Sequence, residues 1–183
     1  MSVKHTATKR LVYCGAALAL AFIASYLQLV KMPWGGSVTL CSMLIICLTG
    51  YWYGLRTGLI TGFAYGILQF LQEPVMLTFF QVCCDYLLGF AALGLAGAFR
   101  HSKNGLVKGY LLAILSRGAF HTLGGYLYWM EYIPEDFPGS LIFIYPFIYN
   151  YSFILAEGIL TLVIIHLPPM AKALNQLKQH ATA

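Results

Sequence analysis

Long continuous apolar runs, separated by short polar stretches, set the pattern of this chain. Six runs stand out, at residues Leu11–Val30, Ser37–Leu55, Thr57–Gln72, Met76–Phe99, Val107–Met130 and Gly139–Leu167. A helix needs about 20 apolar residues to cross a bilayer, whereas membrane β-strands alternate apolar and polar positions over about ten residues. The pattern therefore predicts an all-α membrane protein, folded as a bundle of six transmembrane helices.

The first and last runs carry features of their own. Lys4, Lys9 and Arg10 precede the first run, as in a signal peptide. That run is long enough for a full crossing and no small-residue cleavage site follows it, so we expect a retained first helix. The last run contains Pro146, which removes a backbone hydrogen bond and predicts an interruption inside the sixth helix.

The composition agrees with a membrane location. The 183 residues are 60% apolar and 9% charged, whereas soluble domains are about half apolar and a quarter charged. We expect one transmembrane domain over residues 1–183, in which residues 168–183 form a short, solvated cytoplasmic tail. The basic residues are scattered and form no dense cluster, which argues against a nucleic-acid partner.

The loop charges predict the orientation of the bundle. With the N-terminus in the cytoplasm, the inner side receives nine basic residues and no acidic one: Lys4, Lys9, Arg10, Arg56, Arg100, Lys103, Lys108, Lys172 and Lys178. The outer loops hold one lysine, Lys31, against four acidic residues: Glu73, Glu131, Glu135 and Asp136. Cytoplasmic loops are typically the basic ones, so both termini are predicted to be cytoplasmic.

Small residues recur every four positions on several of the predicted helices. Gly58, Gly62 and Gly66 do so on the third, and Gly15 and Ala19 on the first. Small residues at this spacing let two helix backbones approach closely. We expect internal packing for such stripes, although the stripe on the first helix has a second reading as a contact with a partner protein.

Four ionisable residues remain inside the predicted spans, namely Asp85, Arg117, His121 and Glu157. Such groups are costly at membrane depth and normally face a cavity or each other. Asp85 and His121 each lie about 13 Å below the outer end of their helices, at 1.5 Å per residue. We therefore expect them to line one pocket, and we expect Arg117 to pair with Glu157.

The fifth run carries a stripe of four residues on one helix face, Arg117, His121, Gly125 and Trp129. A core histidine and an interfacial tryptophan would explain two of them without a ligand. Asp85 at the same depth, with Tyr145 and Asn150 from the sixth run, favours a binding site instead. Aromatic faces and a carboxylate suit a flat, nitrogen-rich cation, and the glycine between the two rings would leave a gap for it.

These residues also carry a family resemblance. The matching segments are Ala19-Leu20-Ala21-Phe22-Ile23, Pro33-Trp34-Gly35-Gly36-Ser37-Val38, Leu55-Arg56-Thr57-Gly58, Asp85-Tyr86, Leu93-Gly94-Leu95-Ala96-Gly97, His121-x3-Gly125-x3-Trp129 and Tyr145-x4-Asn150. In this order the chain resembles the thiamine-specific substrate-binding (S) component of energy-coupling factor (ECF) transporters, the ThiT family.

The resemblance implies a six-helix protein that binds thiamine (vitamin B1) with high affinity from outside a bacterial cell membrane. The substrate-binding residues it implies are Asp85, Tyr86, His121, Gly125, Trp129, Tyr145 and Asn150, with Trp34 closing over the ligand. Gly15 and Ala19 match the stripe by which family members dock their shared membrane subunit.

The resemblance also implies partners, a transmembrane (T) subunit and two ATP-binding subunits. The chain itself has no Walker A pattern, which fits an energy supply from elsewhere. We expect no cofactor, no metal and no catalytic residue.

Two alternatives stay open at this point. One is an S component for another vitamin or for a thiamine precursor, such as riboflavin, biotin or a pyrimidine fragment. The other is an intramembrane enzyme that uses Ser37 with His121, or a metal held by Asp85 and His121. Ser37 lacks the G-x-S-x-G pattern of a nucleophile elbow, and two metal ligands are too few, so the enzyme is the weaker alternative.

Overall fold

The computed structural model describes residues 2–32 and 36–182, with side chains from residue 7 onward. The chain is mostly helical. Its helices and strands are α1 (Ser2–Ser25), β1 (Gln28–Lys31), β2 (Ser37–Thr39), α2 (Ser42–Tyr53), α3 (Leu55–Gln72), α4 (Phe79–Val82), η1 (Cys83–Leu88), α5 (Gly89–Ala91), η2 (Ala92–Phe99), α6 (Gly105–Tyr128), η3 (Met130–Tyr132), η4 (Gly139–Ile144), α7 (Tyr145–His166) and α8 (Pro168–Thr182).

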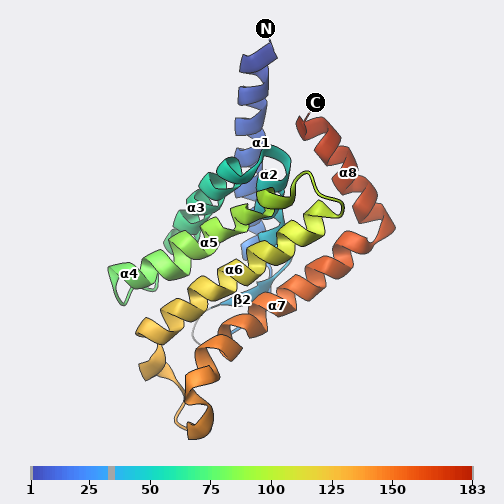
Figure 1. Ribbon diagram of the computed structural model, residues 1–183. Coiled ribbons are helices and arrows are strands. Elements are labelled where there is room, and N and C mark those ends of the chain that lie inside the picture. The colour runs from blue at the N-terminus through green and yellow to red at the C-terminus, as the bar shows by residue number, and fades with distance from the viewer. Residues whose placement is uncertain (1, 33–35, 183) are drawn as a thin grey trace.

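Four inclined helical rods run side by side, formed by α3, the segment from α4 to η2, α6 and α7 (Figure 1). Helices α1 and α2 pack against this layer, and both chain termini lie at the same end of the molecule. Among the described residues, three helices are long and apolar enough to cross a membrane: Ala7–Ser25, Phe79–Phe99 and Gly139–His166.

The first two predicted spans are shorter than expected. Helix α1 ends at Ser25 rather than Val30, and α2 begins at Ser42 rather than Ser37. Between them the two short strands β1 and β2 pair as an antiparallel β-hairpin, in which Val30 lies opposite Val38. β-Branched side chains such as those of these two valines fit a pleated strand. The pairing of the strands gives hydrogen-bond partners to backbone N–H and C=O groups that have none within a helix.

The fourth predicted span is one continuous rod of four segments and three kinds of helix. A short α-helix leads into a π-helix at Cys83–Leu88, then into a further α-turn and a 3-10 helix at Ala92–Phe99. π-Bulges inside helices occur mostly at functional sites. Asp85 lies within the π-helical turn, so the wide turn sets the position of this carboxylate.

Pro146 does not interrupt a helix, contrary to the prediction. It lies in the first turn of α7, directly after the 3-10 turn Gly139–Ile144. Proline is tolerated there because first-turn N–H groups have no partner within the helix.

The C-terminal segment was expected to be a solvated tail, but helix α8 packs against the rest of the protein. Leu174 and Ala181 are buried, and the Tyr53 hydroxyl donates a hydrogen bond to the Ala181 carbonyl oxygen (3.1 Å). The Lys178 ammonium donates to the Tyr51 hydroxyl at 3.1 Å. Helix α8 therefore packs onto α2, because its one apolar face finds a matching surface there.

The glycines of α3 make the close approach that their spacing predicts. A Cβ atom on Gly62 would lie 2.4 Å from the Phe90 carbonyl oxygen, and one on Gly66 would lie 2.4 Å from that of Tyr86. The stripe on α3 is therefore internal packing against the α4–η2 rod. Gly15 differs, because a Cβ there would meet no atom within 4 Å.

Alanine at these two kinds of glycine should have opposite effects. We expect Gly62→Ala to lower the free energy of unfolding by about 1–3 kcal/mol, because the backbone of the facing rod must move. Gly15→Ala is the matched control and should be neutral or slightly stabilising, because alanine favours the helix. Thermal melts in detergent measure both, and equal melting temperatures for the two variants would contradict the packing.

Candidate functional site

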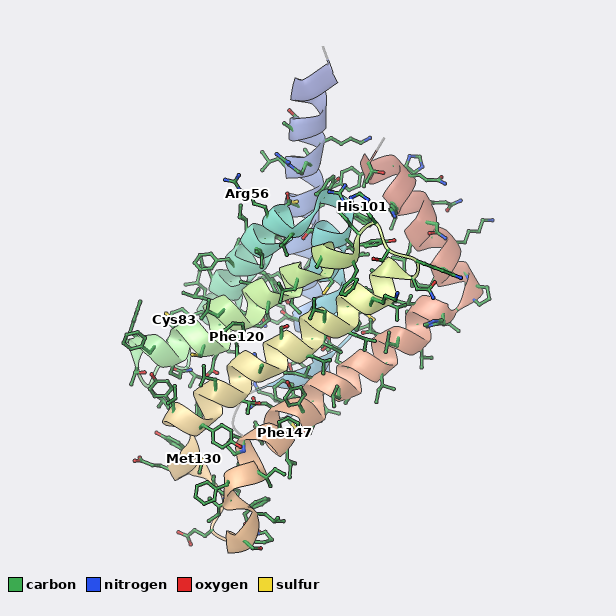
Figure 2. All side chains as sticks on the ribbon, in the orientation of Figure 1. Arg56, Cys83, His101, Phe120, Met130 and Phe147 are labelled. Carbon is green, nitrogen blue, oxygen red and sulfur yellow. The ribbon has the colours of Figure 1, made fainter. Side chains whose placement is uncertain are left out.

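A cavity of about 160 Å³ lies among the helix ends that are remote from the chain termini. Its walls come from the ends of α1 and α3, the β-hairpin, the α4–η2 rod, the last turns of α6 and the first turns of α7. Figure 2 shows Met130, directly after the last turn of α6, at the opposite end of the molecule from Arg56 and His101. Glu73, from a predicted outer loop, also borders the cavity, whereas the predicted inner residue Arg56 lies at the other end of the molecule.

Seven of the sequence-predicted binding residues line this one cavity. They are Asp85, Tyr86, His121, Gly125, Trp129, Tyr145 and Asn150. Trp34 lies outside the described residues. The predicted docking residues Gly15 and Ala19 are exposed on α1 and do not border the cavity.

Asp85 is the centre of a hydrogen-bonded group. Its Oδ2 atom accepts from the Gln81 amide at 2.7 Å and from the Trp129 indole N–H at 3.0 Å. Its Oδ1 atom faces His121 Nδ1 at 3.6 Å. The carboxylate is thus held in place by two donors on Oδ2, while Oδ1 keeps acceptor capacity for a further donor.

Gln81 was missed by the sequence reasoning, although a local signal exists. It lies four residues before Asp85, and residues at this spacing meet on one helix face. A glutamine one turn from a membrane carboxylate is a natural hydrogen-bond partner for it.

His121 is held between a cation and a carboxylate. The Arg117 Nε–H group donates to His121 Nε2 at 3.2 Å, so Nε2 acts as an acceptor. The ring proton then lies on Nδ1, the nitrogen that faces Asp85. Arg117 also lies over the Phe90 ring, 4.0 Å from its centroid, and borders the cavity.

The predicted pairing of Arg117 with Glu157 is wrong. Glu157 is 2% exposed, and its carboxylate accepts from the Thr39 N–H (2.8 Å), the Thr39 hydroxyl (2.7 Å) and the Met43 N–H (3.2 Å). The first N–H groups of a helix lack partners within it, and a carboxylate satisfies them well. Glu157 therefore fixes the start of α2 and the end of the hairpin.

Gly125 has a second role beside bordering the cavity. A Cβ atom there would lie 2.7 Å from Pro146 Cβ, so the glycine lets α7 approach α6. The predicted gap in front of this glycine is filled in part by Pro146. Asn150 reinforces the contact, because its amide donates to the carbonyl oxygens of Pro146 (2.8 Å) and His121 (3.3 Å).

Aromatic rings form the outer part of the cavity. The Trp129 and Tyr132 ring centroids are 5.2 Å apart, and those of Tyr145 and Tyr149 are 5.7 Å apart. The Tyr86 hydroxyl instead anchors a loop, since it donates to the Glu73 carbonyl oxygen at 2.7 Å and accepts from the Val75 N–H at 3.2 Å. Aromatic faces around a carboxylate favour a flat cation.

Comparison with known proteins identifies the family. The family model described as thiamine transporter protein (Thia_YuaJ) matches residues 11–177. Thiamine transporter ThiT of Bacillus subtilis (strain 168) is 30% identical to this chain, in a match that covers 86% of this chain and 89% of that protein. A solved structure of ThiT from Listeria monocytogenes shares the fold, with a TM-score of 0.66 at 19% identity over 87% of this chain and 94% of that one.

The family model spans nearly the whole chain, so the match does not rest on one helix or one motif. On this evidence the chain is a membrane protein that belongs to the thiamine transporter protein family.

Proposed function

We propose that this protein is the high-affinity thiamine-binding S component of an ECF-type uptake transporter in a bacterial plasma membrane. It crosses the membrane six times with both termini in the cytoplasm, and it takes thiamine from outside. The nine-to-none excess of basic residues on the predicted inner side supports this orientation. The family is one of transporters, which speaks against the enzyme alternative.

The observation that carries the proposal is a buried carboxylate in an aromatic cavity. Asp85 is 9% exposed and borders the cavity together with His121 and Trp129. Thiamine joins a thiazolium cation to an aminopyrimidine, so it offers both a positive charge and N–H donors. A carboxylate that is shielded from water attracts both the cation and the N–H donors, and Trp129 offers an indole face beside it.

Transport requires partners, which we propose to be a T subunit and two ATP-binding subunits. Gly15 and Ala19 support a docking surface on α1, because both are exposed while Ala17 and Ala21 on the same helix are buried. The buried alanines pack against the helices of this chain, whereas the exposed Gly15–Ala19 stripe is available to a helix of a partner subunit.

The purified chain alone should bind thiamine. We expect thiamine to quench tryptophan fluorescence through Trp129 and to raise the melting temperature in detergent, because a ligand that binds only the folded state stabilises it. Riboflavin, biotin and the isolated aminopyrimidine are the comparison ligands. A larger melting shift with one of them than with thiamine would assign the protein to another vitamin or precursor.

A bulky residue on the exposed face of α1 should separate binding from assembly. We expect Gly15→Leu to keep thiamine affinity unchanged and to lose co-purification of the T and ATP-binding subunits. The control is Ile159→Leu, a mild change at an exposed position of α7, outside the α1 stripe. Retention of the whole complex by Gly15→Leu would remove this stripe from the docking surface.

A further inference from the structure

The cavity has a second polar wall, on the side of α1 and α3. It consists of Ser25 at the end of α1, with Gln69 and Gln72 in the last turn of α3, and we call it the amide wall. All three residues border the same cavity as Asp85 and His121. Ser25 is 3% exposed, and Gln69 and Gln72 are half-buried at the edge of the cavity.

The hydrogen bonds within the amide wall use only part of its capacity. The Gln69 amide nitrogen donates to Ser25 Oγ and to Gln72 Oε1, both at 3.1 Å, which uses its two hydrogens. Ser25 Oγ has one hydrogen, with the Phe22 carbonyl oxygen at 2.7 Å and Gln72 Oε1 at 2.9 Å as acceptors. Within the described part of the chain, Gln69 Oε1 and the Gln72 amide nitrogen take part in no hydrogen bond.

The unused groups are one acceptor and one donor, and both are neutral. The charged residues next to them offset each other, because Glu73 is paired with Lys31 at 2.6 Å. A hydroxyl group fits this combination, since it accepts one hydrogen bond and donates another. A charged group would find no net opposite charge here.

We propose that Ser25, Gln69 and Gln72 form a subsite for the neutral hydroxyl chain of the ligand, in the same cavity in which Asp85, His121 and Trp129 take its rings. This inference rests on the proposed function. Thiamine carries one hydroxyethyl chain on its thiazolium ring, at the end remote from the aminopyrimidine. The Gln72 amide donates to that hydroxyl and Gln69 Oε1 accepts from it, while Ser25 holds the Gln69 amide in place.

The test compares thiamine with its analogue in which ethyl replaces hydroxyethyl, by titration of the purified full chain. We expect the wild-type protein to bind the analogue about tenfold more weakly, as for the loss of a hydrogen-bonded group in a partly buried site. In Gln69→Leu and Gln72→Leu the two ligands should bind about equally. Gln176→Leu, an exposed glutamine on α8, is the matched control and should keep the wild-type ratio.

The ratio of the two affinities separates this inference from the proposed function. Equal binding of both ligands by the wild-type protein, or an unchanged ratio in both glutamine variants, would overturn the subsite while leaving thiamine binding intact. The wild-type comparison needs no substitution, so it decides even where a variant does not fold. Absence of thiamine binding by the wild-type protein would instead overturn the proposed function, and this inference with it.

Discussion

Asp85→Ala is expected to weaken thiamine binding by tenfold or more. The variant loses the negative charge that faces the ligand, and a hydrogen bond to a charged group contributes about 1.5–3 kcal/mol, which corresponds to roughly 10–150-fold in affinity. It also leaves the Gln81 amide and the Trp129 indole without the acceptor that positions them. Titration of tryptophan fluorescence or calorimetry in detergent measures the change.

Companion variants separate charge from shape. Asp85→Asn keeps the size and removes the charge, so a loss similar to that of Asp85→Ala assigns the effect to the charge. His121→Ala should also cost tenfold or more, because it removes the ring between Arg117 and Asp85. Asp136→Ala, in an exposed loop, is the control and should bind normally. Unchanged affinity in both Asp85→Ala and His121→Ala would refute the site.

The second large effect concerns stability. Glu157→Ala leaves the buried N–H groups of Thr39 and Met43 without an acceptor. Each unsatisfied buried group costs about 1–3 kcal/mol, so we expect a loss of about 2–5 kcal/mol and a low yield of folded protein in detergent. The start of α2 and the β-hairpin should loosen together, since one carboxylate holds both.

The controls distinguish this role from a general loss of charge. Glu157→Gln keeps one acceptor oxygen but turns an N–H₂ group toward donors, so its loss should be smaller than that of alanine yet measurable. Glu131→Ala removes an exposed carboxylate and should melt like the wild-type protein. A wild-type melting temperature for Glu157→Ala would show that the carboxylate does not hold the hairpin.

Much of the helical pattern follows from the sequence because hydropathy is a local property. The predicted third and fifth spans begin and end within two residues of α3 and α6. The breaks between spans were less accurate at Val30 and Ser37, where a short hairpin replaces helix. A strand of three or four residues has too few positions to show an alternating pattern.

The polar residues of the cavity were accessible to sequence reasoning for a similar reason. One helix face carries His121, Gly125 and Trp129, because they are spaced four residues apart. A carboxylate such as Asp85 is energetically unfavourable at membrane depth and therefore needs a partner. The amide wall gave no such signal, because Ser25 and Gln69 come from two helices and lie at the polar ends of apolar runs.

The sequence alone therefore determined the apolar helices, the uneven distribution of charge and the acid, imidazole and indole that border the cavity. Only the tertiary structure decided which partner each membrane charge takes. Glu157 binds Thr39, which lies 118 residues away along the chain, and not Arg117. An unpaired charge is costly to bury, so each membrane charge needs some partner. The packing of the helices selects which partner comes within hydrogen-bond distance.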